Sequence, residues 1–188
     1  IIVPEDFSYS QIRAPWVQDR LWPNGVVPFQ FKSNVTPDNP NRMLAAMAEW
    51  EQTANVDFIP RTNEGDWVEI RDANENSSFV GRKGGMQVIN IYNWNYKFIM
   101  CHELVHCLCY WHEQSRPDRD TYVQINWNNI EKGEEHNFDK RVDAGQYSSY
   151  DFDSVMHYGQ YFFSVNGHPT ITILPPSQSW QNKIGQYD

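Results

Sequence analysis

Residues 101–113 read Cys-His-Glu-Leu-Val-His-Cys-Leu-Cys-Tyr-Trp-His-Glu, and this stretch decides how the chain is expected to fold. It lies within a run, residues 96–111, that is apolar on nearly every face, so we predict a helix buried through the middle of the molecule. Residues four apart lie on one face of a helix, so His102 and His106 can converge on one ion. Neutral imidazoles at this spacing suit tetrahedral zinc.

Glu103 lies beside this pair of imidazoles rather than between them, because it is about 100° further round the helix than His102. From there its carboxylate can take a proton from a water bound to the metal. Zinc lowers the pKa of such a water to about 7. The sequence therefore indicates that Glu103 acts as a general base, and later as a general acid, in a hydrolytic reaction.

A third candidate ligand, His112, cannot come from the same straight helix. At 1.5 Å per residue it would stand roughly 9 Å further along the axis than His106, so the helix must stop and the chain must fold back. A left-handed glycine is the usual device, but no Gly or Pro lies between these two histidines. A lone His on an apolar face is more often a hydrogen-bonded core residue, and His112 at this interval favours the metal site instead.

The rest of the chain predicts strands first and the buried helix later. Alternating apolar residues indicate strands at 27–31, 68–70 and 88–91, with a late strand-like run at 170–173. Pro40 is expected to open a helix with apolar residues at helical spacing, namely Met43, Leu44, Met47 and Trp50. Because strands and helices do not alternate regularly, the pattern favours an α+β domain.

Length and composition exclude several classes of protein. The 188 residues correspond to one domain, or one domain of two lobes. Twenty-four acidic against fifteen basic residues leave a net charge of −9, so nucleic acid is not an expected partner. No apolar stretch approaches the roughly 18 residues that span a bilayer. The three cysteines lie within 101–109, which is unlike a disulfide framework, so buried inert thiols are expected.

The histidine stretch resembles a known signature. Metzincin zinc peptidases carry H-E-x-x-H-x-x-G-x-x-H followed by a Met-turn, and this chain has the three histidines and the glutamate of that pattern. Residues 112–120, His-Glu-Gln-Ser-Arg-Pro-Asp-Arg-Asp, resemble the astacin extension of the signature. Residues 154–158, Ser-Val-Met-His-Tyr, resemble the astacin Met-turn with its tyrosine. The similarity continues in 21–26, 79–82 and 137–139, and runs from about 21 to 186.

The resemblance to astacins implies a secreted zinc endopeptidase that is made as an inactive precursor. Such an enzyme hydrolyses internal peptide bonds of proteins or peptides by attack of a zinc-bound water that a glutamate activates. The implied fold is α+β and two-lobed, within a single peptidase domain over 1–188. An N-terminal lobe, 14–112, would hold a mixed sheet and long helices, and a mostly irregular C-terminal lobe, 113–188, would follow across a cleft. Residues 1–13 would be a propeptide remnant, able to act as an inhibitor, or an N-terminal extension.

The same resemblance implies roles for individual residues in the metal site. His102, His106 and His112 would bind one Zn²⁺ per chain, with Glu103 as the catalytic base. Tyr158 would be an additional, displaceable ligand that swings to stabilise the oxyanion of the tetrahedral intermediate.

Further residues are implied to lie near this site. Met156 would form an apolar floor beneath the metal, and Glu113 would meet the ammonium of the mature N-terminus. A substrate would add itself as a strand along an edge segment, which here comprises Asn76, Ser77, Ser78 and Phe79.

Some positions depart from the astacin pattern. Cys109 stands where the signature has glycine, and a side chain on left-handed backbone costs on the order of 1–2 kcal/mol. The usual family disulfides find no cysteine at 53–55 or 76–77. Two alternatives to an active peptidase stay open, a catalytically silent zinc module and a peptidase held latent by residues 1–13. Glu103 and Tyr158 argue against the silent module, which has no need of either.

Overall fold

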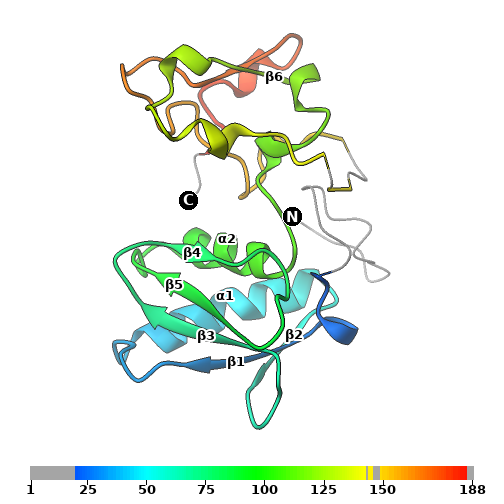
Figure 1. Cartoon of the computed structure of the whole chain (residues 1–188), viewed down its shortest axis with the longest axis vertical. Coiled ribbons are helices and arrows are strands. Elements are labelled where there is room, and N and C mark those ends of the chain that lie inside the picture. Colours follow the sequence, from blue (N-terminus) through cyan, green and yellow to red (C-terminus); the bar gives the residue numbers. More distant parts are fainter. Residues whose placement is uncertain (1–19, 143, 146–148, 186–188) are drawn as a thin grey trace. The chain divides into compact units, whose positions relative to one another are not determined.

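The computed structural model describes residues 20–142, 144–145 and 149–185, which fall into two compact units. The first unit holds residues 20–110, and the second holds the described residues from Trp111 onward (Figure 1). The expectations for 1–13, and for the ends of the two predicted lobes at 14–19 and 186–188, concern residues outside this description.

A five-stranded mixed sheet organises the first unit, in the order β2-β1-β3-β5-β4. Its strands are β1 (Val26–Phe31), β2 (Asp57–Pro60), β3 (Trp67–Asp72), β4 (Ser77–Ser78) and β5 (Met86–Ile91). Neighbouring strands are parallel from β2 to β5, whereas β4 runs antiparallel to β5, with Ser77 opposite Asn90. The short strand β4 therefore forms one edge of the sheet.

Two helices, α1 (Asn39–Thr53) and α2 (Lys97–Cys107), pack against each other and against this sheet (Figure 1). α1 has Pro40 in its first turn, where the missing N–H breaks no helical hydrogen bond. Its inner face buries Met43, Ala46 and Met47. α2 is buried over most of its length from Met100 to Cys107, because the core surrounds it.

The α+β class is confirmed, as are the strands expected at 27–31, 68–70 and 88–91 and the helix that opens at Pro40. Strand β2 was not expected, because only Phe58 of its four residues is buried and no alternation is visible in so short a segment. The buried helix is shorter than the predicted 96–111. It ends at Cys107, since the backbone turns left-handed at Cys109 with φ of 85°.

The second unit is mostly irregular, as expected. Its regular part is an antiparallel pair, β6 (Val123–Ile125) and β7 (Ile171–Ile173), which confirms the late strand-like run. Short 3₁₀ turns carry much of the remainder, at Glu113–Ser115, Arg119–Thr121, Trp127–Asn129, Glu135–Phe138 and Gln178–Trp180. Apolar side chains from the two strands, the turns and the segments between them share one core, which includes Phe138, Tyr150 and Ile184. Among the described residues, no helix is long and apolar enough to cross a bilayer.

Candidate active site

Three histidines come together around the end of α2. His102 and His106 lie one turn apart on the helix, with ring centroids separated by 4.7 Å. His112 follows the end of the helix, and one ring nitrogen from each of the three lies within 4.8 Å of the others. Within the described part of the chain, these are the residues with ligand atoms so grouped. Three imidazoles at this separation can share one metal ion.

The turn between His106 and His112 depends on Cys109. This residue adopts the left-handed conformation that the signature reserves for glycine, with φ of 85°. Its backbone N–H donates to the carbonyl oxygen of His106 at 2.9 Å, and the N–H of Leu108 donates to that of Leu104 at 2.9 Å. These bonds close the last turn of α2. The absence of glycine therefore does not prevent the turn; a cysteine takes the strained position instead.

The Cys109 side chain fits against a glycine from another loop. Its thiol donates to the carbonyl oxygen of Arg20 at 2.8 Å. A Cβ placed on Gly81 would lie only 2.8 Å from this sulfur, so the two segments approach closely because Gly81 has no side chain. The N–H of Gly81 also donates to the carbonyl oxygen of His106 at 2.8 Å. This loop thus holds the helix turn that carries His106.

His106 is held in one tautomer by a backbone carbonyl. Its Nδ1 lies 2.7 Å from the carbonyl oxygen of Tyr110. A carbonyl oxygen can only accept, so Nδ1 carries the hydrogen and Nε2 keeps its lone pair for a metal. Burial, with repulsion from His102, lowers the pKa of His106 to about 3, so the imidazole is neutral near pH 7.

Glu103 is a buried carboxyl group without a full set of hydrogen bonds. Its side chain is 5% exposed, and its Oε2 has no hydrogen-bond partner among the described residues. Burial, with repulsion from Glu75, raises the pKa of Glu103 to about 8. A nearby cation and its water would satisfy such a group. The donor set and this unpartnered oxygen therefore fit a zinc ion with a hydrolytic water beside it.

The Met-turn is tied to the residues that follow His112. The N–H of Glu113 donates to the carbonyl oxygen of Met156 at 3.0 Å, and the N–H of Tyr158 donates to Oε1 of Gln114 at 3.1 Å. The Tyr158 ring lies 4.3 Å from the His112 ring, centroid to centroid. Met156 is fully buried. These contacts place a tyrosine beside the third histidine.

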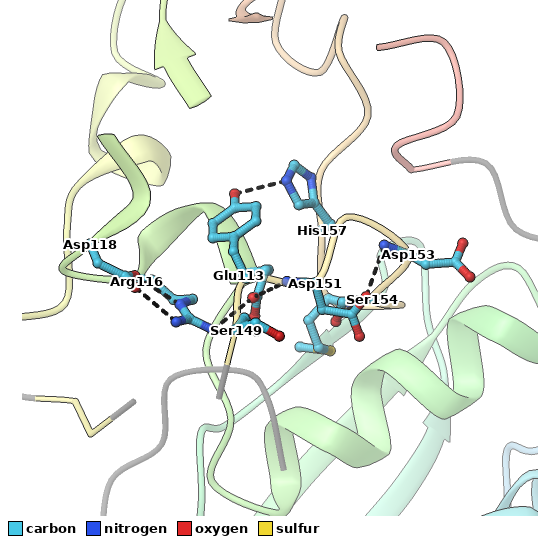
Figure 2. A network of polar contacts seen from close by, with 10 residues as sticks. Glu113, Arg116, Asp118, Ser149, Asp151, Asp153, Ser154 and His157 are labelled. Atoms are coloured by element: carbon cyan, nitrogen blue, oxygen red, sulfur yellow. Dashed lines mark hydrogen bonds and ion pairs between the residues drawn. The ribbon is translucent and has the colours of Figure 1, made fainter. Parts of the chain in front are cut away.

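Glu113 belongs to a buried polar network, shown in Figure 2. Its Oε1 accepts from Arg116 Nη1 at 3.1 Å and from the backbone N–H of Asp151 at 2.8 Å. Arg116 also donates from Nε and Nη2 to the two oxygens of Asp118, each at 2.9 Å. Burial raises the pKa of Glu113 to about 8 in spite of Arg116. The ammonium expected to meet Glu113 belongs to residues outside the description.

The expected substrate-binding segment lies at the β4 edge of the sheet. Asn76 uses its side chain internally: Oδ1 accepts from the backbone N–H of Tyr92 at 2.8 Å, and Nδ2 donates to Oδ1 of Asn93 at 2.7 Å. Ser77 Oγ accepts from Asn90 Nδ2 at 3.0 Å. Phe79, 37% exposed, has the Arg20 guanidinium 5.1 Å from its ring centroid.

Sequence reasoning missed three contributors to this site. Gly81 is one, although it falls in the family-like stretch 79–82 and so left a signal. The Tyr110 carbonyl gave no such signal, because every residue has a backbone carbonyl and the residue type does not reveal which one will be used. Glu75 is the third, because its charge helps to raise the pKa of Glu103. The two residues are far apart in the sequence, and nothing in the local sequence indicates this interaction.

Comparison with known proteins is consistent with this geometry. The model of the astacin peptidase family matches residues 16–188. The chain is 38% identical over 173 residues to astacin-like metalloendopeptidase of Mus musculus, covering 88% of this chain and 40% of the relative. It is 43% identical over 164 residues to tolloid-like protein 2 of Homo sapiens, covering 84% of this chain and 16% of the relative.

A solved structure is also similar. High choriolytic enzyme 1, a hatching enzyme zinc-protease from medaka fish (Oryzias latipes), superposes with a TM-score of 0.76 at 34% identity. The match covers 90% of this chain and 85% of that one. By contrast, the chain spans less than half the length of the curated relatives it matches.

Proposed function

The chain belongs to the astacin family, and on that premise we propose that it is the catalytic domain of a zinc-dependent endopeptidase that hydrolyses internal peptide bonds of proteins. The observation that carries this proposal is the convergence of His102, His106 and His112 next to a buried Glu103 whose Oε2 is unpartnered among the described residues. Those groups are what zinc-assisted hydrolysis requires.

Zinc, when bound, would polarise the scissile carbonyl and lower the pKa of a water molecule. The three histidines would hold one ion per chain, each through one ring nitrogen, and the Tyr110 carbonyl keeps His106 in the required tautomer. Glu103 would accept the proton of the attacking water and return it to the leaving amine. Tyr158, beside His112, would donate a hydrogen bond from its hydroxyl group to the developing oxyanion.

The β4 edge is proposed to receive the substrate as an added strand over residues 76–79. Support comes from the place of β4 at the end of the strand order. The side chains of Asn76 and Ser77 are hydrogen-bonded to β5 and to the residues just after it. The backbone of this segment is therefore the part that would pair with a substrate strand. Ser78 and the exposed Phe79 complete the segment.

Other proposals rest on family membership. The domain is proposed to have an N-terminal lobe over 14–112 and a C-terminal lobe over 113–188, with 1–13 as propeptide remnant or extension. Met156 would underlie the metal, and Glu113 would meet the mature N-terminus. Secretion and synthesis as an inactive precursor are proposed on the same ground.

The decisive experiment is casein hydrolysis by the pure chain, alone, after a zinc chelator, and after zinc is restored. Activity should disappear and return. Glu103→Gln should still bind one zinc per chain yet lose at least about 10²–10⁴-fold in turnover, because general-base catalysis is removed. One bound zinc without hydrolysis would instead support a silent module. Activity that appears only after trimming near Arg13 would support latency.

A further inference from the structure

A cavity lies in the second unit, and none of its lining residues is among those assigned to the metal or to the substrate strand. Its volume is about 490 Å³. The strand β6 and the flanking 3₁₀ turns contribute most of its lining, which is apolar at Val123, Ile125 and Leu174. The other side chains that line it are charged, polar or aromatic, namely Arg119, Asp120, Gln124, Trp127 and Lys140.

Arg119 supplies a buried positive charge to this cavity. The residue is 3% exposed, and its guanidinium is fixed by the carbonyl oxygens of Gln114 and Phe138, both of which accept from Nη1. Its Nε donates to Oδ1 of Asp120 at 2.9 Å. No hydrogen bond of the described residues uses its Nη2. A buried guanidinium with donors to spare is suited to an oxyanion.

Lys140 adds a second positive charge on the other side of Asp120, with Nζ in an ion pair with Oδ2. Two cations and one carboxylate leave the cavity with a net charge of about +1, while the chain as a whole carries −9. Both oxygens of Asp120 already accept from these cations. The cavity therefore favours an anion over a neutral ligand. A sugar, for example, would find few hydrogen-bond acceptors there for its hydroxyl groups.

Trp127 adds an aromatic wall. It is 46% exposed, although one side is held by Phe138 in an edge-to-face contact with centroids 6.5 Å apart. The Arg119 guanidinium carbon lies 5.9 Å from the Trp127 ring centroid. A fixed and partly open indole next to a cation can pack against an apolar side chain whose neighbour is anionic.

We propose that this cavity binds an acidic peptide segment. An Asp or Glu carboxylate would be held by Arg119 and Lys140, and an adjacent aromatic or aliphatic side chain would pack on Trp127. A single carboxylate matches the small surplus of positive charge, whereas a polyanion would be repelled by the net charge of −9 that the chain carries. This site is separate from the proposed peptidase function and needs neither zinc nor Glu103.

The test compares two short blocked peptides, acetyl-Asp-Phe-amide and acetyl-Asn-Phe-amide, by calorimetric titration of the full chain at low ionic strength. The Asp peptide should bind at least about tenfold more tightly, because only it places a charge against Arg119 and Lys140. Added salt should narrow the difference. Equal affinity for the two peptides in the unmodified protein would overturn the proposal.

Two variants locate the binding. Lys140→Gln and Trp127→Leu should each weaken the Asp peptide about fivefold or more, since they remove the charge surplus and the aromatic wall. Lys132→Gln removes the same charge from an exposed residue outside the cavity and should change nothing. If Lys140→Gln behaves like Lys132→Gln, or Trp127→Leu binds normally, the peptide binds elsewhere and the proposal fails. A zinc chelator should leave binding unchanged, which separates this site from the proposed active site.

Discussion

At the scale of single residues, the proposed metal site depends on conformations that side-chain chemistry does not reveal. Cys109 turns the chain between two candidate ligands with a positive φ that disfavours any side chain. Its sulfur has room because Gly81, which faces it, has no side chain. The backbone carbonyl of Arg20 accepts a hydrogen bond from its thiol. Local strain is thus balanced by contacts from a distant loop, which hold the turn between His106 and His112.

Replacement of Cys109 should reveal that strain. Cys109→Gly is expected to be more stable than Cys109→Ala by about 1 kcal/mol, because both lose the sulfur and only glycine relieves the left-handed backbone. Cys101, inside α2, is the matched control. There the glycine variant should be less stable than the alanine variant by about 1 kcal/mol, since glycine weakens a helix interior. Urea unfolding measures both differences, and the same order at both positions would contradict the strain argument.

Tyr158 should act on the reaction rather than on binding. Tyr158→Phe removes only the hydroxyl, so kcat should fall about 10–100-fold while KM changes by less than about threefold. Steady-state hydrolysis of a peptide substrate gives both constants. Tyr161→Phe, at an exposed tyrosine of the same unit, should leave both unchanged. An unaltered kcat in Tyr158→Phe would show that this hydroxyl has no part in the transition state.

At the scale of elements, hydrogen bonds in the first unit connect the end of β3 with the start of α1. Asp72 ends β3, and its Oδ2 accepts from the backbone N–H of Thr36 at 3.0 Å and from the Thr36 hydroxyl at 2.6 Å. Its Oδ1 accepts from Nδ2 of Asn39, the first residue of α1, at 3.2 Å. One carboxylate therefore fixes where α1 begins relative to β3.

Loss of this carboxylate should loosen the start of α1. Asp72→Asn should cost about 1–2 kcal/mol of unfolding free energy near pH 7, because charge-assisted hydrogen bonds are lost. Asp38→Asn is the control, since Asp38 makes no capping hydrogen bond to α1. It should change stability by less than about 0.5 kcal/mol. Denaturant unfolding monitored by far-ultraviolet circular dichroism tests both.

The effect of Asp72 should also depend on pH. Although burial acts to raise the pKa of Asp72, hydrogen bonds from Thr36 and Asn39 hold it below the usual value for an aspartate. The folded pKa is therefore below the unfolded one. The stabilisation is complete above the unfolded value and is lost as pH falls through the folded value. The difference in unfolding free energy between wild type and Asp72→Asn should shrink as the pH falls below the ordinary aspartate pKa of about 4. A constant difference down to pH 2 would contradict this account.

At the scale of the whole molecule, the chemistry proposed for zinc draws on widely separated parts of the sequence. α2 provides two histidines and Glu103, the turn after it provides His112, and the Met-turn provides Tyr158. A bound ion would link these parts because residues from each of them would coordinate it. Metal binding should then contribute to the stability of the entire domain.

Zinc should raise the melting temperature of the chain on the order of 10 °C. Free zinc at 1,000 times its dissociation constant contributes about 4 kcal/mol, and each kcal/mol shifts Tm by about 2–4 °C in a domain of this size. His112→Ala should lose most of this shift. Glu103→Gln should keep it, because Glu103 is not proposed as a ligand. Calorimetry with zinc and with chelator measures the shift; its persistence in His112→Ala would remove that residue from the ligand set.

The sequence by itself determined the features that depend on short separations along the chain. The spacing of His102 and His106 places them on one helical face, alternation located three strands of the first sheet, and Pro40 opened α1. The match of 102–120 and 154–158 to astacin motifs indicated the family. Within a helix or strand, geometry follows from a fixed repeat, so spacing alone is informative.

Tertiary structure decided what depends on contacts between distant segments. The left-handed Cys109 is tolerated because Gly81 and the Arg20 carbonyl surround its sulfur. Strand β2 exists because β1 supplies a partner along its length. The cavity that joins Arg119, Trp127 and Lys140 combines residues with no common spacing or motif. Such features arise from packing, whose energy is shared among segments far apart in the chain, so no local pattern encodes them.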